Sequence, residues 1–164
     1  NLGNGLVKNF YQNGNPRSFF YYVNDTLNGR FEKYNKEGNL SSLSNYLNGK
    51  LHGKFSTYFK DGYLKNFYNY EAGIRQGKFK EFYEKGLLKL EGIIVKGEID
   101  GILKEYHKNG KIKEIANFVD GELEGQLKSY DKNGILKKEH FYKAGKLIDL
   151  KSNNFLTKDY SKSY

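Results

Sequence analysis

Apolar and aromatic residues recur along the chain at a constant step of 24 residues. One position is aromatic in every copy: Phe10, Tyr34, Tyr58, Phe82, Tyr106 and Tyr130. A second position is bulky and apolar in every copy: Val7, Phe31, Phe55, Phe79, Leu103 and Leu127. Similarity of a chain to itself at a fixed period is typical of repeat architectures, in which each unit packs mainly on its neighbours.

The glycines follow the same step. They form three series, which contain 17 of the 19 glycines: Gly5, Gly29, Gly53, Gly77, Gly101 and Gly125; Gly14, Gly38, Gly62, Gly86, Gly110 and Gly134; and Gly49, Gly73, Gly97, Gly121 and Gly145. We therefore divide the chain into an array over residues 1–148, with six units that start at the glycines of the first series, and a remainder over residues 149–164. The remainder has no glycine, and it is predicted to be either a C-terminal cap or a flexible tail.

Each unit contains two segments of strand length on either side of its middle glycine. That glycine often follows Asn or Asp, as at Asn13, Asp61 and Asn109, and such pairs between apolar segments indicate a β-hairpin. The connection to the next unit, such as Asn48–Gly53, is predicted to be longer. We expect an all-β fold, an elongated single-layer antiparallel meander of six hairpins, with at least ten strands that pair in sequence order and no helix longer than about two turns before Leu147.

Stacking of equivalent hairpins should place ring over ring, so Tyr58, Phe82 and Tyr106 are predicted to form the core. The alternation is imperfect, because Phe55 and Tyr58 are three residues apart and a regular strand would point them to opposite faces. Either a bulge brings them together or both faces of the sheet carry rings.

Composition and charge favour some kinds of partner and one cellular location over others. The formal net charge is +9, which favours anionic partners such as acidic glycans, anionic lipids or nucleic acid. There is no cysteine, so disulfides and thiolate metal sites are excluded, and no apolar window is long enough for a membrane-spanning helix. An extracytoplasmic or secreted location is favoured over a cytoplasmic one.

Two rows of side chains are candidates for partner binding. The first row is basic and flanks the middle glycine of the units: Lys60, Lys65, Lys89, Lys108, Lys113, Lys132 and Lys137. The second adjoins the aromatic position and varies between units: Tyr11, Phe59, Tyr83 and His107. The alternatives are that the lysines prevent aggregation through sheet edges and that the rings cover the second face of the sheet.

No catalytic, cofactor or metal site is expected. His52, His107 and His140 occupy three different positions of the repeat, so their spacing suggests neither a zinc site nor a catalytic triad. The acidic residues lie mostly among lysines, where solvated cross-strand pairs explain them.

The copies "GKFSTYFKDGYLKNFYNYEAG" and "GILKEYHKNGKIKEIANFVDG" resemble the MORN repeat, and more closely its bacterial variant. The resemblance extends from Gly5 to about Leu147, with departures at Pro16, Asp25 and Arg75 and no tryptophan. It implies antiparallel hairpins in a long single-layered sheet that serves as a binding or scaffold module, in proteins often described as antitoxin components or as surface-associated.

Together, these features predict a non-enzymatic repeat module for protein–protein interaction or scaffolding. The alternative is a module that binds glycan or anionic lipid in a bacterial envelope or secreted protein. Nucleic acid is the least favoured partner, because no recognised nucleic-acid-binding motif is present.

Overall fold

The computed structural model describes residues 3–148, which form one open antiparallel sheet of 16 strands. The strands are β1 (Gly5–Phe10), β2 (Pro16–Val23), β3 (Thr26–Tyr34), β4 (Leu40–Leu47), β5 (Lys50–Leu51), β6 (Gly53–Tyr58), β7 (Leu64–Glu71), β8 (Ile74–Arg75), β9 (Gly77–Phe82), β10 (Leu88–Val95), β11 (Glu98–Ile99), β12 (Gly101–Tyr106), β13 (Ile112–Val119), β14 (Glu122–Tyr130), β15 (Leu136–Lys143) and β16 (Lys146–Ile148). A short 3₁₀ turn, η1, covers Glu84–Gly86.

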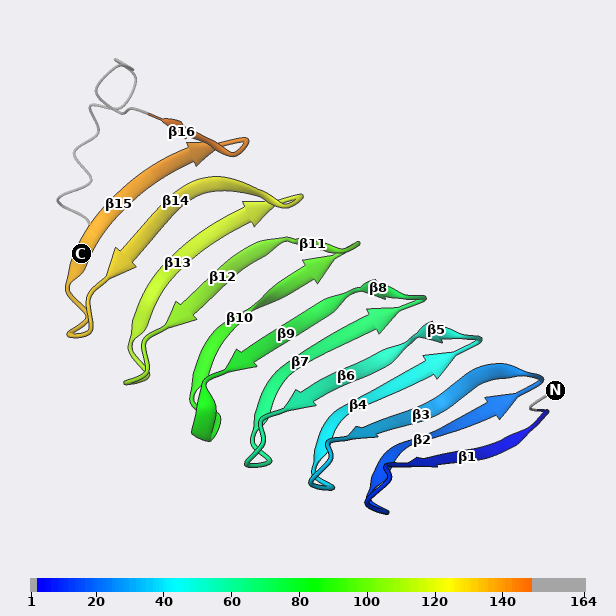
Figure 1. The fold of residues 1–164 in the computed structure, drawn as a ribbon. Helices are drawn as coiled ribbons and strands as arrows, with labels where there is room; N and C mark the ends of the chain where they lie inside the picture. Colours follow the sequence, from blue (N-terminus) through cyan, green and yellow to red (C-terminus); the bar gives the residue numbers. More distant parts are fainter. Residues whose placement is uncertain (1–2, 149–164) are drawn as a thin grey trace.

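The strands pair in sequence order, and the hairpins lie side by side in a single layer, with β1 and β16 at opposite ends of the row (Figure 1). The two-residue strands β5, β8 and β11 pair beside this path with β4, β7 and β10. The predicted all-β, single-layer antiparallel meander is therefore confirmed. The predicted cap or tail, residues 149–164, lies outside the described residues.

Two kinds of turn alternate along the chain. The wide turn contains the middle glycine: Phe59 N donates to Tyr63 O at 2.8 Å, Gly62 N donates to Phe59 O at 3.0 Å, and the same pattern occurs at six places. The tight turn has two central residues, Asn48 and Gly49 in one copy, with φ of 50° and 76°. Positive φ at both positions is the mark of a type I′ hairpin turn.

The predicted lengths of these two connections were wrong. We expected the tight turn at Asn-Gly in the middle of the unit and a longer connection at Asn48–Gly53. In the structure the chain re-enters the sheet directly after Gly49, because Lys50 pairs with Leu47 and Leu51 pairs with Tyr46. Both connections are thus hairpins, and the tighter one joins neighbouring units.

A one-residue bulge follows each wide turn. Tyr58 pairs with Leu64 and Thr57 pairs with Asn66, so Lys65 has no partner across the ladder. The same register shift leaves out Arg17, Ser41, Lys89, Lys113 and Lys137. The bulge lies in the strand after the turn and does not change the alternation from Phe55 to Tyr58, so these two rings lie on opposite faces.

Both faces therefore carry aromatic rings. On one face, Phe31 packs against Phe20 and Tyr46, with ring centroids 4.9 and 5.9 Å apart. On the other face, Phe19 packs against Phe10 and Tyr34, with centroids 6.0 and 5.5 Å apart. We call the face of Phe31 the core face, because it carries all the buried side chains.

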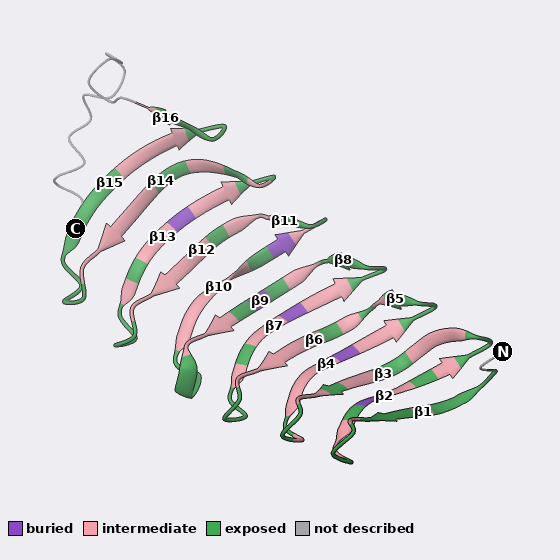
Figure 2. Cartoon of the chain, in the orientation of Figure 1, coloured by how far each residue is buried: buried purple, intermediate pink, exposed green. Residues whose placement is uncertain are grey.

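The core is a thin band across the middle of the core face, visible as isolated buried segments on successive long strands (Figure 2). It consists of Ser18, Ser44, Tyr68, Phe79, Ile94 and Ala116. Phe79 is 3% exposed, and its ring stacks on Tyr68 with centroids 5.5 Å apart and an interplanar angle of 6°. A one-layer sheet has no second layer to cover it, so few side chains are fully buried.

The row predicted as the core was the wrong one. Tyr58, Phe82 and Tyr106 are only half-buried, and Phe10 in the same row is 55% exposed. Phe79 and Phe82 are three residues apart in β9, so their side chains lie on opposite faces of the sheet. Phe79 pairs with Gly92, and Phe82 pairs with Leu88 beyond the bulge.

Arg75, a departure from the repeat at an apolar position, is held by the aromatic side chains around it. Its guanidinium carbon lies 4.1 Å from the centroid of the Tyr68 ring, and its Nε donates to the Tyr70 hydroxyl at 3.0 Å. A cation over an aromatic face is a favourable contact, so the sheet accommodates the charge without burying it.

Ala72 is the first central residue of a tight turn, with a φ of 48°. Asn adopts this left-handed conformation more readily than Ala, so Ala72→Asn should raise the free energy of unfolding by roughly 1 kcal/mol. Asn48 occupies the equivalent position with a φ of 50°, so Asn48→Ala should lower the free energy of unfolding by a similar amount. Urea unfolding measures both, and a shift of the same sign in the two variants would contradict the assignment.

Candidate functional site

The wide turns together form one long edge of the sheet, which we call the wide-turn edge (residues 11–17, 35–41, 59–65, 83–89, 107–113 and 131–137; Figure 1). It carries eleven basic residues: Arg17, Lys36, Lys60, Lys65, Lys85, Lys89, Lys108, Lys111, Lys113, Lys132 and Lys137. It carries four acidic residues: Glu37, Asp61, Glu84 and Asp131. This edge is therefore strongly positive.

The tight turns form the opposite edge, which we call the tight-turn edge (residues 23–29, 47–53, 71–77, 95–101, 119–125 and 143–148). Here seven acidic residues, Asp25, Glu71, Glu98, Asp100, Asp120, Glu122 and Glu124, exceed five basic ones, Lys50, Arg75, Lys96, Lys143 and Lys146. The two edges of the sheet thus differ in the sign of their charge, and an acidic partner would be drawn to the wide turns.

All seven predicted lysines lie on the wide-turn edge. Lys60, Lys108 and Lys132 are the second residues of wide turns and are exposed, whereas Lys65, Lys89, Lys113 and Lys137 are the bulge residues. Of the seven, only Lys137 belongs to β15, the last long strand of the described row. Lys65, Lys89 and Lys113 belong to β7, β10 and β13, which have a strand on each side.

Two of the bulge lysines are paired with carboxylates on the preceding strand. Lys89 Nζ lies 3.5 Å from Glu81 Oε2, and Lys113 Nζ lies 2.8 Å from Glu105 Oε1. Lys65 has Thr57 at the equivalent position, and its Nζ instead lies 5.8 Å from the centroid of the Phe59 ring.

The predicted aromatic row has a structural role that sequence reasoning missed. The Tyr11 hydroxyl donates to Tyr34 O at 2.8 Å, and the Tyr83 hydroxyl donates to Tyr106 O at 2.9 Å. His107 Nε2 lies 2.9 Å from Tyr130 O, to which it must donate because a carbonyl only accepts. Each of these side chains links a wide turn to the end of a strand in the next unit, and we call such a bond a rung.

Phe59, the remaining member of this row, has no hydrogen-bond donor in its side chain and makes no rung. The carbonyl equivalent to Tyr34 O and Tyr106 O is Phe82 O, which is 23 residues further along the chain. Asn35 stands at the same repeat position and, within residues 3–148, also makes no rung; its Oδ1 accepts from Asn39 N at 2.9 Å. The residue type at this position therefore does not by itself show which carbonyl a side chain reaches.

Other side chains also join neighbouring wide turns. Asn13 donates to Lys36 O at 2.9 Å, Asn39 to Lys60 O at 3.4 Å, and Asn109 to Lys132 O at 2.7 Å. Within residues 3–148, no side-chain hydrogen bond joins turn 59–63 to turn 83–87. Asp61 stands where Asn13 and Asn109 stand in their turns and has no N–H to donate; its Oδ1 accepts from Tyr63 N at 3.4 Å.

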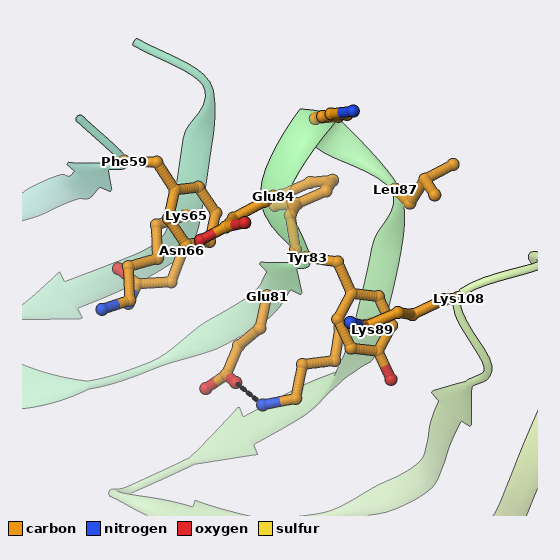
Figure 3. A pocket seen from close by; sticks show the side chains of 11 residues that line it. Phe59, Lys65, Asn66, Glu81, Tyr83, Glu84, Leu87, Lys89 and Lys108 are labelled. Atoms are coloured by element: carbon orange, nitrogen blue, oxygen red, sulfur yellow. Dashed lines mark ion pairs between the residues drawn. The ribbon is translucent and has the colours of Figure 1, made fainter. Parts of the chain in front are cut away.

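A groove with a volume of about 690 Å³ lies at this junction (Figure 3). Its lining includes five of the predicted residues, Phe59, Lys65, Tyr83, Lys89 and Lys108, together with Asn66, Glu81, Phe82, Glu84, Lys85 and Leu87. The other predicted residues, Tyr11, Lys60, His107, Lys113, Lys132 and Lys137, lie elsewhere on the wide-turn edge.

Charges in the groove are only partly paired. Glu81 is paired with Lys89 and also accepts a hydrogen bond from the Tyr68 hydroxyl. Burial of Tyr68, together with this hydrogen bond, raises the pKa of the Tyr68 hydroxyl to about 12. Lys108 Nζ lies 5.8 Å from the centroid of the Tyr83 ring. Lys65 and Lys108 thus sit beside aromatic rings on either side of the groove, where an incoming anion could contact them.

The described residues gather no set of groups suited to metal chemistry. Within residues 3–148, no three His, Cys, Asp or Glu side chains form a group that could hold a metal ion. The same residues contain no helix that is long and apolar enough to cross a membrane.

Comparison with known families identifies the repeat. The MORN repeat variant model matches residues 4–24, 27–48, 99–120 and 123–144, which together make up more than half of the 164 residues. No curated protein matches the chain. The four matched stretches leave out residues 49–98, which contain the groove residues Phe59, Lys65, Tyr83 and Lys89. The sheet, the recurrent turns and these matches show that the chain belongs to the MORN repeat variant family.

Proposed function

We propose that this chain is a non-catalytic binding module whose wide-turn edge contacts an acidic partner protein. The observation that carries this proposal is the excess of eleven basic over four acidic residues on that edge, opposite an edge on which acidic residues are in excess. Charges separated in this way orient a partner as it approaches and exclude partners of the same sign.

The wide turns hold these charges at regular intervals. Each wide turn has the same backbone hydrogen bonds, and successive wide turns are two strands apart, which corresponds to about 9–10 Å. A binding surface built from short turns on a rigid sheet loses little conformational freedom when a partner binds.

An anionic lipid surface or a glycan of a bacterial envelope is the second candidate, because the lysines follow one extended line. The protein partner is favoured, since the same edge also presents the rings of Phe59 and Tyr83 in a groove. Aromatic residues are enriched in the cores of protein interfaces.

The test compares two variants with the same change in charge. In the first, Lys60, Lys108, Lys132 and Lys137 on the wide-turn edge are changed to Gln. In the second, Lys50, Lys96, Lys143 and Lys146 on the tight-turn edge are changed to Gln. Exposed substitutions of this kind usually alter stability by less than about 0.5 kcal/mol each, and circular dichroism checks that both variants keep the fold.

Cross-linking in cells of the native source, followed by mass spectrometry, should recover a protein partner with the wild type and the second variant but not with the first. Parallel sedimentation with vesicles that contain phosphatidylserine tests the lipid alternative. Salt-sensitive vesicle binding that only the first variant loses, without loss of any protein partner, would contradict the proposal. Self-association of the first variant alone would instead support a role of the lysines in preventing aggregation.

A further inference from the structure

We propose that the groove between turns 59–63 and 83–87 binds a short acidic segment of the partner, and that a donor group of this segment takes the place of the missing rung. The inference rests on the proposed function and specifies where on the wide-turn edge, and with which chemistry, the partner is recognised.

Phe82 O is an acceptor that, in the described part of the chain, receives no side-chain hydrogen bond. The carbonyls of Tyr34, Tyr106 and Tyr130 each receive a hydrogen bond from a side chain of the preceding wide turn. Phe82 O is their equivalent, and Phe82 lines the groove. Since Phe59 cannot donate, a hydroxyl or N–H of a bound segment can reach the position that Tyr11, Tyr83 or His107 occupies at three of the other junctions.

The lining of the groove has an excess of positive charge. Four lysines line the groove, Lys65, Lys85, Lys89 and Lys108, against two carboxylates, Glu81 and Glu84. Glu81 is already engaged by Lys89 and by the Tyr68 hydroxyl. Lys65 and Lys108 flank the opening, so carboxylates of a bound segment would be placed between two cations.

The groove also has apolar walls and the size of a ligand site. The rings of Phe59 and Tyr83 come from successive wide turns and provide apolar walls, and a volume of about 690 Å³ lies within the range of ligand sites. An acidic peptide fits this combination because it offers carboxylates, apolar side-chain stems and hydrogen-bond donors together. A bare anion such as inorganic phosphate would not use the rings.

The probe for this site is a copolymer of glutamate and tyrosine, with poly-glutamate as the comparison that lacks the hydroxyl. Fluorescence anisotropy should show salt-dependent binding of the copolymer to the full chain, and tighter binding than poly-glutamate. In ¹H–¹⁵N spectra the shifted amides should lie in residues 59–65 and 82–89. Failure of the copolymer to bind, or shifts spread evenly over all the wide turns, would overturn the inference.

The decisive variant is Phe59→Tyr. The added hydroxyl should donate to Phe82 O, as Tyr11 and Tyr83 do to their carbonyls, and thereby occupy the place of the ligand's donor. Affinity for the copolymer should fall about tenfold while the thermal midpoint is unchanged or raised. Unchanged affinity in this variant would overturn the inference.

A pair of charge variants provides the matched control. Lys65→Gln with Lys108→Gln should weaken copolymer binding about tenfold, whereas Lys132→Gln with Lys137→Gln, an equal charge change outside the groove, should weaken it much less. Glu84→Gln, which removes a negative charge from the lining, should strengthen binding. Equal weakening by the two lysine pairs would overturn the groove as the site. The proposed function is judged separately, by cross-linking of the native partner.

Discussion

Replacing Phe79 with alanine should lower the free energy of unfolding by about 3–5 kcal/mol, the largest effect we expect from a single substitution in this protein. Phe79 is 3% exposed, stacks on Tyr68 and packs in one cluster with Tyr68 and Ile94. A one-layer sheet has few alternative contacts with which to fill the space of a lost ring, so the cavity should persist.

Phe82 is the matched control, since it is the same residue type in the same strand, β9, and lies on the opposite face. It is only half-buried, so Phe82→Ala should lower the free energy of unfolding clearly less than Phe79→Ala does. Urea unfolding followed by circular dichroism and by tyrosine fluorescence measures both and also tests whether the array unfolds in one step. A loss for Phe82→Ala equal to or greater than that for Phe79→Ala would mean that the core lies on the other face.

Gly92→Leu should lower the free energy of unfolding by about 2–3 kcal/mol through overpacking. A Cβ at this position would lie 3.0 Å from both Leu103 Cδ1 and Phe79 Cε1, closer than side-chain carbons normally approach. Gly92→Ala should lower the free energy of unfolding less than Gly92→Leu does, because the two contacted atoms belong to side chains that can shift. Ile93→Leu, at the neighbouring and 41% exposed residue, should have little effect.

The double variant tests the cause. Phe79→Ala removes the ring that occupies the space beside Gly92, so Gly92→Leu should be less harmful in that background and the two losses should not add. Urea unfolding of the two single variants and the double variant gives the coupling energy. Strict additivity would show that the glycine is needed for a reason other than the proximity of Phe79.

The role of Gly92 is one that the 24-residue pattern did not predict. It is a glycine outside the three 24-residue series, in the interior of β10, where the other units have Phe20, Ser44, Tyr68, Ala116 and His140. The variation at this position looks like loss of pattern in the sequence. In the structure Gly92 pairs with Phe79, and a Cβ at Gly92 would lie 3.0 Å from that ring, so in this unit the large ring stands beside the smallest residue.

The residues of the candidate site were named from the sequence, but the groove that they form is visible only in the structure. The sequence pointed to the residues Phe59, Tyr83, Lys65, Lys89 and Lys108 as members of two rows, and the structure brings these five together in one groove. The rungs were not predicted, because Tyr11, Tyr83 and His107 each reach a carbonyl 23 residues away in the next unit. A pattern of residue types along the chain does not show which carbonyl a side chain reaches.

The sequence by itself determined the all-β class, the 24-residue period and the order of the strands, because glycine at positive φ and apolar residues at strand positions act over short distances and recur in every unit. The tertiary structure decided which face holds the core, since that depends on the pairing register and on the bulges at residues such as Lys65. It also decided where the groove lies. Its lining comes from successive units, with Phe59, Tyr83 and Lys108 in three different wide turns, and these residues come together only when the turns stack.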